Sequence, residues 1–134
     1  MSKDVIVKIG KEPYKTEVHI EPHIIVADEP KEVGGQDAGP APTELFLSSL
    51  GTCKAMTVRM YADRKEWEVD TVEVTLSMDK QKGELQDTTF IRCHIRLSGN
   101  LDEEQRQRLL NIADKCPVHK ILSNPIVVES NLVI

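Results

Sequence analysis

Three cysteines, Cys53, Cys93 and Cys116, have the most distinctive chemistry in this chain. A cysteine thiolate is a nucleophile that peroxides oxidise to a sulfenic acid, and a second thiol then converts the sulfenic acid to a disulfide. The chain is acidic and its N-terminus has no signal-peptide core, which indicates a reducing cytosol. In that compartment a disulfide is more often catalytic than structural, so each cysteine is a candidate for redox chemistry as well as for packing.

The surroundings of the three cysteines favour different roles. Cys93 alternates with isoleucines along an expected strand, which is typical of a small buried residue. Cys53 lies inside a long apolar segment, where it is either a core residue or a nucleophile that needs a nearby cation or base. Cys116 precedes a proline. It either ends one helix, where the dipole disfavours a thiolate, or caps the next helix, where the dipole favours a thiolate.

Histidines accompany two of the cysteines: His94 follows Cys93 directly, and His119 lies three positions after Cys116. His119 either polarises Cys116 or lies at the surface. The spacing matches no zinc motif, and no dinucleotide, phosphate-loop or serine-hydrolase motif occurs. We therefore expect neither a metal nor an organic cofactor.

Length and charge argue against several classes of protein. The 134 residues fit one domain, 1–134, whose core must rely on aliphatic side chains because only 4% of residues are aromatic. A net charge of −5 argues against binding to nucleic acid. No apolar run reaches the roughly 18 residues of a transmembrane helix. We expect a cytoplasmic protein that has no membrane partner.

The longest apolar segment, residues 39–61, predicts a helix of about twenty residues that contains Cys53. Thr43 is the expected N-cap, and Glu44 follows at the positive end of the helix dipole. Gly51 lowers the helix propensity, which indicates that another backbone packs closely there. Apolar residues cover most of this helix and predict that it is buried. The main stripe contains Phe46, Leu50, Cys53, Met56 and Met60.

The segments before and after this helix predict an α+β fold, without the strict alternation of a doubly wound sheet. A β-meander of three short strands is expected near residues 5–9, 16–20 and 23–27. A loop rich in Gly and Pro follows over 28–42, and its length is typical of functional loops. Two alternating segments, 69–78 and 88–97, predict a long hairpin.

A second helix is expected after Asp102, because Asp102 and Gln105 have the spacing of a capping box. Its apolar face is expected to hold Leu109, Ile112, Ala113 and Cys116. Pro117 ends this helix or begins a short one that reaches Leu122. Residues 125–134 predict a final strand.

Two segments carry a resemblance to a known family. They are GGQDAGPAPTELFLSSLGTCKAMTVRMYA, which starts at Gly34, and ADKCPVHKILSNPIVVESNL, which starts at Ala113. Their content and order resemble the osmotically inducible protein C and organic hydroperoxide resistance family (OsmC/Ohr), in its OsmC-like branch. The resemblance implies an intertwined homodimer of the OsmC-like fold.

The resemblance also implies a thiol-dependent peroxidase with Cys53 as the peroxidatic residue and Cys116 as the resolving residue. A thiol or dithiol reductant would then restore both thiols. Because the central helix is rich in Leu and Met, we expect organic hydroperoxides to be preferred over polar ones. In the best-studied branch of the family, an arginine of the N-terminal hairpin and a glutamate ten residues before the reactive cysteine activate the thiol.

This sequence departs from the family at both activating positions. Its first arginine is Arg59, and Lys11 is the nearest basic residue in the N-terminal hairpin. Lysine lacks the bidentate fork of a guanidinium group. Thr43 lies ten residues before Cys53, and Glu44 is the acid one position later. The expected catalytic set is thus Cys53, Cys116 and Glu44.

Two other functions are compatible with the sequence. The first is a protein that binds a small apolar ligand and uses its cysteines only for packing, which the missing arginine favours. The second is a thiol redox sensor, which would use the same chemistry to signal to a downstream partner.

Overall fold

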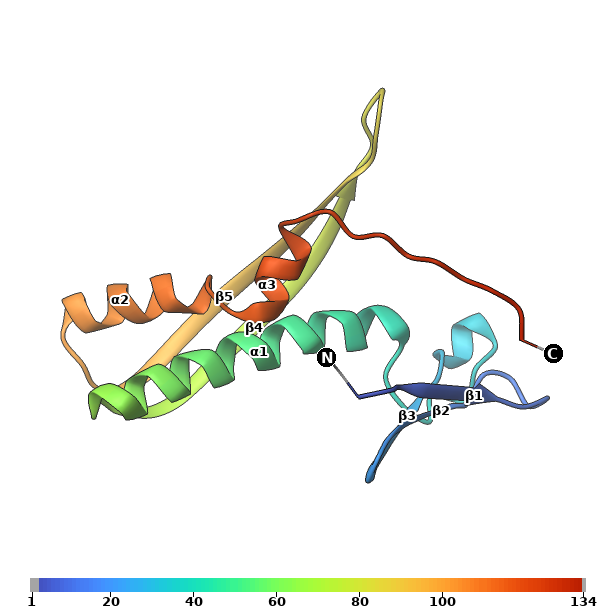
Figure 1. Ribbon diagram of the computed structural model, residues 1–134, viewed down its shortest axis with the longest axis horizontal. Helices are drawn as coiled ribbons and strands as arrows, with labels where there is room; N and C mark the ends of the chain where they lie inside the picture. The colour runs from blue at the N-terminus through green and yellow to red at the C-terminus, as the bar shows by residue number, and fades with distance from the viewer. Residues whose placement is uncertain (1–2, 134) are drawn as a thin grey trace. The chain divides into compact units, whose positions relative to one another are not determined.

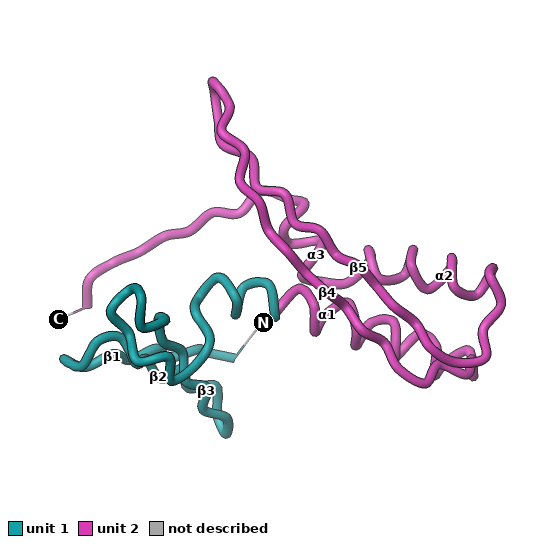
Figure 2. Tube along the Cα trace, turned by 180° about the vertical axis from the view of Figure 1, so that it is seen from behind, with its two compact units in different colours: residues 1–48 teal, residues 49–134 magenta. Residues whose placement is uncertain are grey.

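Figure 1 shows the computed structural model of the chain, which describes residues 3–133. The elements follow in the predicted α+β order. They are β1 (Ile6–Ile9), β2 (Thr16–Ile20), β3 (His23–Ala27), the short 3₁₀ helix η1 (Lys31–Val33), α1 (Pro42–Lys65), β4 (Glu68–Gln81), β5 (Thr88–Asn100), α2 (Glu103–Ala113) and α3 (Pro117–Leu122). They form two units, residues 1–48 and 49–134 (Figure 2), and α1 begins in the first and continues in the second.

In the first unit, β1, β2 and β3 form one antiparallel sheet in that order, which confirms the three predicted strands. Val18 of β2 lies opposite Val7 of β1 on one side and opposite Ile25 of β3 on the other. Such cross-strand pairs of β-branched residues stabilise an antiparallel sheet. The meander is therefore held by its aliphatic residues as well as by its backbone.

Asp28 organises the loop that follows β3. Burial alone would disfavour its carboxylate, but four backbone N–H groups donate to the carboxylate oxygens and hold the pKa of Asp28 below its ordinary value. The donors, at 2.7 to 3.2 Å, belong to Ala38, Glu29, Gln36 and Tyr14. Much of the predicted 28–42 loop is thus arranged around one carboxylate.

The prediction that Thr43 caps α1 is wrong, because the helix already begins at Pro42. Proline suits this first position, where its missing N–H would have had no partner within the helix. The carboxylate of Glu44 accepts a hydrogen bond from the backbone N–H of Ala41 at 2.8 Å. Glu44 therefore satisfies an unpaired donor at the start of the helix.

The prediction that α1 is buried on most of its surface is also wrong. The residues that are buried lie mainly at intervals of four: Leu50, Gly51, Lys54, Val58 and Ala62. Met56 and Met60 are 58% and 63% exposed. The buried stripe is displaced from the predicted one because only the side of α1 that meets the rest of the second unit is covered. Gly51 does pack closely, but a Cβ there would meet the side chain of Leu76, at 2.6 Å, and not a backbone.

The second unit is built on the hairpin of β4 and β5, which confirms the two predicted strands. Leu76 lies opposite Cys93, and Val74 lies opposite Ile95. Figures 1 and 2 show α1 and α2 on the same face of this hairpin. The buried core between these elements consists of Val58, Ala62, Val69, Leu109 and Ala113.

The C-terminal helices resolve one alternative that the sequence left open. Asp102 and Gln105 form the predicted capping box at the start of α2. A separate helix, α3, begins at Pro117, and Cys116 is its N-cap. The prediction of a final strand is wrong for residues 125–133, which form no strand, and residue 134 lies outside the described part. A strand needs a hydrogen-bonded neighbour, and none pairs with this segment in the described chain.

Within residues 3–133, none of the helices is both long enough and apolar enough to cross a membrane.

Candidate active site

Cys53 and Cys116, which are distant in sequence, meet where α1 packs against the start of α3. The Cys53 thiol lies near enough to Cys116 to raise the pKa of that buried thiol. The Sγ atom of Cys53 also accepts a hydrogen bond from the backbone N–H of Val118, at 3.5 Å. The Sγ atom of Cys116 accepts one from the N–H of His119, at 3.4 Å, as an N-cap side chain does. The structure therefore brings two of the three expected catalytic residues together.

The two thiols differ in their access to solvent. Cys116 is fully buried, whereas Cys53 is half-buried. Burial raises the pKa of the Cys116 thiol, the contact with Cys53 raises it further, and the His119 N–H and the charge of Lys54 partly offset these effects. Cys53 is thus the thiol of the pair that a molecule from solution can reach.

Lys54, which the sequence analysis did not select, is the charged residue closest in the chain to Cys53. Its side chain is buried, with 1% of its surface exposed. Its ammonium nitrogen lies 3.2 Å from the carbonyl oxygen of Ala113, 3.1 Å from Oδ1 of Asp114 and 2.8 Å from Nδ1 of His119. One signal could have identified it, because Lys54 lies four residues after Leu50 and four before Val58 on the buried stripe.

A cavity of about 330 Å³ lies beside this network in the second unit. Cys93 contributes to its wall, and burial raises the pKa of that thiol. The predicted packing role of Cys93 is thus incomplete, since the residue is half-buried and faces a cavity. The lining residues combine aliphatic and polar side chains: Leu50, Lys54, Thr89, Ile91, Cys93, Asp114, His119, Leu122 and Ser123.

Glu44 and Lys11, the residues expected to stand in for the family's activating pair, both lie in the first unit. The Glu44 carboxylate is engaged with the N–H of Ala41 at the start of α1. Lys11 is exposed in the turn after β1. A catalytic role for Glu44 therefore stays a prediction.

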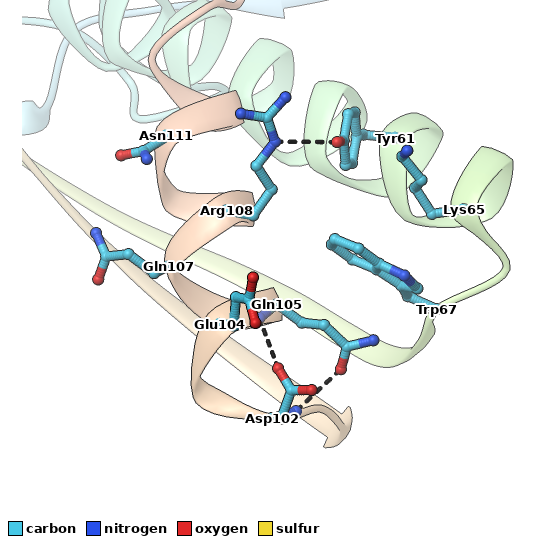
Figure 3. Close-up of a pocket in the computed structure, with 9 residues that line it drawn as sticks. All are labelled: Tyr61, Lys65, Trp67, Asp102, Glu104, Gln105, Gln107, Arg108 and Asn111. Carbon is cyan, nitrogen blue, oxygen red and sulfur yellow. Dashed lines mark hydrogen bonds between the residues drawn. The ribbon is translucent and has the colours of Figure 1, made fainter.

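A larger cavity, of about 610 Å³, lies between the C-terminal part of α1 and α2 (Figure 3). There Arg108 donates a hydrogen bond from Nε to the Tyr61 hydroxyl, at 3.0 Å, and this bond lowers the pKa of Tyr61 despite partial burial. Asp102 and Gln105, also at this cavity, are occupied by the capping box. The cavity is lined by no cysteine or histidine, so it offers no nucleophile for thiol chemistry. Among the described residues, no group of three or more His, Cys, Asp or Glu side chains is arranged to hold a metal ion.

Solved structures with the same architecture are numerous. The OsmC-like protein from Mycoplasma pneumoniae superposes with a TM-score of 0.77 at 16% identity, over 92% of this chain and 88% of that one. An organic hydroperoxide resistance protein OsmC from Legionella pneumophila gives 0.66 at 20% identity, over 89% and 88%. The organic hydroperoxide resistance protein OhrB of Bacillus subtilis gives 0.62 at 20% identity, over 90% of each chain. At these identities the similarity establishes the fold.

No curated protein matches the chain in sequence. The family model for OsmC-like proteins, however, matches residues 34–131, which include both cysteines of the thiol pair and most of the chain. On the strength of that match, with the fold and the paired thiols in agreement, this chain belongs to the OsmC-like protein family.

Proposed function

We propose that this protein is a thiol-dependent peroxidase that reduces organic hydroperoxides, with Cys53 as the attacking thiol and Cys116 as the resolving thiol. The observation that carries the proposal is the approach of a half-buried thiol, Cys53, to the segment that contains a fully buried one, Cys116. The Sγ atom of Cys53 accepts a hydrogen bond from the N–H of Val118, two residues after Cys116. A pair of this kind suits a cycle in which one sulfur meets the substrate and the other waits beside it.

The reaction proceeds in three steps. The Cys53 thiolate attacks the terminal oxygen of the peroxide ROOH, so that an S–O bond forms, the O–O bond breaks, and the alcohol ROH leaves with the proton that the thiol lost. The Cys116 sulfur then attacks the sulfenic acid; an S–S bond forms, and the hydroxyl group leaves as water with the Cys116 proton. A thiol or dithiol reductant finally returns both sulfurs to thiols by exchange and is itself oxidised to a disulfide.

The preference for organic hydroperoxides has two supports. The relatives from Legionella pneumophila and Bacillus subtilis are named for resistance to organic hydroperoxides. The helix of Cys53 also exposes the apolar side chains of Met56 and Met60 within two turns of the thiol. Because the cycle consumes thiol reductant, we place the protein in the reducing cytoplasm.

The proposal predicts a specific disulfide. One equivalent of cumene hydroperoxide should consume two thiols per chain and link Cys53 to Cys116, because the Sγ atom of Cys53 already lies against the first turn of α3, which Cys116 caps. Intact-mass measurement followed by peptide mapping would detect the bridge. The Cys93→Ser variant is the matched control and should form the same bridge. Recovery of an unreacted Cys53 after treatment with peroxide would contradict the proposal.

A second candidate function has one observation in its favour. The first unit contains a cavity of about 330 Å³ whose wall is almost entirely apolar. Its aliphatic lining includes Val7, Ile9, Val18 and Leu45. A protein that binds a small apolar ligand in this cavity, without thiol chemistry, would leave Cys53 and Cys116 reduced in the same peroxide experiment.

The peroxidase is proposed to act as a homodimer. Many aliphatic side chains of both units are exposed in the single chain, more than a monomer ordinarily shows. They include Ile6, Val7, Ile9 and Ile24 in the first unit, and Val127, Val128, Leu132 and Val133 in the second. A second copy of the chain is expected to cover them. Size-exclusion chromatography with light scattering should therefore report twice the mass of one chain, and a stable monomer at micromolar concentration would refute the dimer.

A further inference from the structure

The buried Lys54 side chain uses its entire hydrogen-bonding capacity. An ammonium group has three N–H donors and no acceptor. Three acceptors surround it, namely the Ala113 carbonyl, the Asp114 carboxylate and the His119 ring, all within 3.2 Å. A buried charge is tolerated in a protein only when it is paired and fully hydrogen-bonded. The three hydrogen bonds of Lys54 are therefore a requirement of its burial in the second unit and not a chance contact.

The three acceptors lie on both sides of Cys116 in the chain. Ala113 ends α2 and Asp114 follows it, whereas His119 lies in the first turn of α3. The Lys54 side chain of α1 thus binds both ends of the turn that contains Cys116. Cys53 is the neighbour of Lys54 in α1, so the same bonds fix the distance between the two sulfurs.

The charge of the Lys54 ammonium also acts on the buried thiol of Cys116. The positive charge of Lys54 acts on Cys116 and favours its thiolate, against the effect of burial. It acts in the same sense on Cys93, across the neighbouring cavity. A neutral side chain at position 54 would leave Cys116 buried without this compensation.

From these observations we propose that Lys54 is a positioning residue for the resolving step, holding the Cys116 turn against Cys53 so that the disulfide forms before the sulfenic acid is oxidised further. The inference rests on the proposed peroxidase cycle. In the step concerned, the Cys116 sulfur forms the S–S bond to Cys53, the S–O bond of the sulfenic acid breaks, and the hydroxyl group departs as water with the Cys116 proton.

The same bonds define the state of His119. Because an ammonium group can only donate, Nδ1 of His119 accepts the bond from Lys54, and the ring carries its proton on Nε2. This tautomer is a signature of the Lys54 contact that does not depend on peroxide chemistry. Long-range ¹H–¹⁵N correlation spectra distinguish the two tautomers directly.

The test replaces Lys54 with Met, which has a similar length and no charge. Lys120→Met is the matched control, since Lys120 is an exposed residue of α3. Losing the charged hydrogen bonds should slow formation of the Cys53–Cys116 disulfide by about tenfold or more. The attack of Cys53 on peroxide should slow less, so that dimedone traps more sulfenic acid in Lys54→Met than in wild type or in Lys120→Met.

Equilibration with glutathione separates this inference from the proposed function, because it forms the disulfide without peroxide. The equilibrium constant for the Cys53–Cys116 disulfide should fall about tenfold in Lys54→Met, or ~30 mV for this two-electron couple, and His119 should lose its preference for the Nε2–H tautomer. If wild type does not react with peroxide but these two differences are observed, the peroxidase proposal fails. Lys54 would then still position Cys116 for disulfide formation with Cys53, although not in a peroxidase cycle. An unchanged equilibrium constant would overturn the positioning role.

A second variant tests the same role of Lys54 in case Lys54→Met does not fold. The Asp114 side chain is 63% exposed, so Asp114→Asn removes one charged acceptor of Lys54 at little risk to the core. It should reduce the disulfide equilibrium constant in the same direction and by a smaller factor than Lys54→Met. A wild-type constant in Asp114→Asn, combined with a wild-type rate of disulfide formation, would contradict the proposal.

Discussion

Replacing Cys53 with serine should reduce hydroperoxide consumption to the background rate measured without protein. A serine hydroxyl is not ionised near neutral pH and does not form the sulfenic acid on which the cycle depends. The side chain is nearly the same size, and the site is only half-buried, so the fold should be unaffected. Peroxide loss in the presence of dithiothreitol, followed with a ferrous dye assay, measures the effect.

The Cys93→Ser variant is the control for this experiment. Cys93 lies on β5 beside the cavity, and it takes no part in the thiol pair. Its replacement should leave most of the activity in place. A Cys53→Ser protein that still consumes peroxide, while Cys93→Ser does not, would reassign the reactive thiol to Cys93.

Removing Cys116 should have the second largest effect, because it separates the two halves of the cycle. In Cys116→Ser, the first equivalent of peroxide should still oxidise Cys53, but no intramolecular disulfide should follow. The sulfenic acid should then persist or be oxidised to sulfinic acid when peroxide is in excess. Mass spectrometry should detect gains of one or two oxygen atoms on the peptide that contains Cys53.

The resolving role of Cys116 also predicts the direction in which pH changes the rate of disulfide formation. The attacking species is the Cys116 thiolate, and burial raises the pKa of that thiol. The rate of disulfide formation should therefore rise about tenfold per pH unit at neutral pH and continue to rise above about pH 8.5, where an ordinary thiol begins to level off. A rate that is already constant between pH 7 and 8 would contradict a resolving role for the buried thiol.

Local patterns were sufficient to predict most of the fold. Short segments rich in aliphatic residues, most of them alternating, predict all five strands, and the spacing of Asp102 and Gln105 predicts the start of α2. These features depend on residues close together in the chain, so a single sequence contains the information needed. The N-cap of α1 was missed because Ala41 is not a usual capping residue and the Glu44 side chain performs that task.

Features that depend on distant residues were not predictable from pattern. The buried stripe of α1 includes Lys54, because three acceptors from the α2–α3 turn surround its charge. From the sequence alone, a lysine in an apolar helix is expected to be exposed to solvent, because the acceptors that surround it are not known. The last segment, residues 125–133, has the composition of a strand but lacks a partner strand in the described chain.

The thiol pair was expected only through resemblance to a family. The residues around Cys53 are compatible with either a core residue or a nucleophile. The residues around Cys116 are compatible with either the end of one helix or the N-cap of the next. Their contact depends on how α3 packs on α1, a tertiary relation that neither segment encodes by itself. The catalytic role of Glu44 and the stand-in role of Lys11 remain predictions for mutagenesis.

The hairpin of β4 and β5 has a consequence for handling the protein. A sheet of only two strands leaves the outer backbone edge of each strand without a partner, and such edges invite pairing with unrelated chains. Pairing of this kind joins two or more chains, so its rate rises steeply with the concentration of the protein. The concentration at which this protein is stored thus becomes part of its quality control, with turbidity expected first in the most concentrated samples.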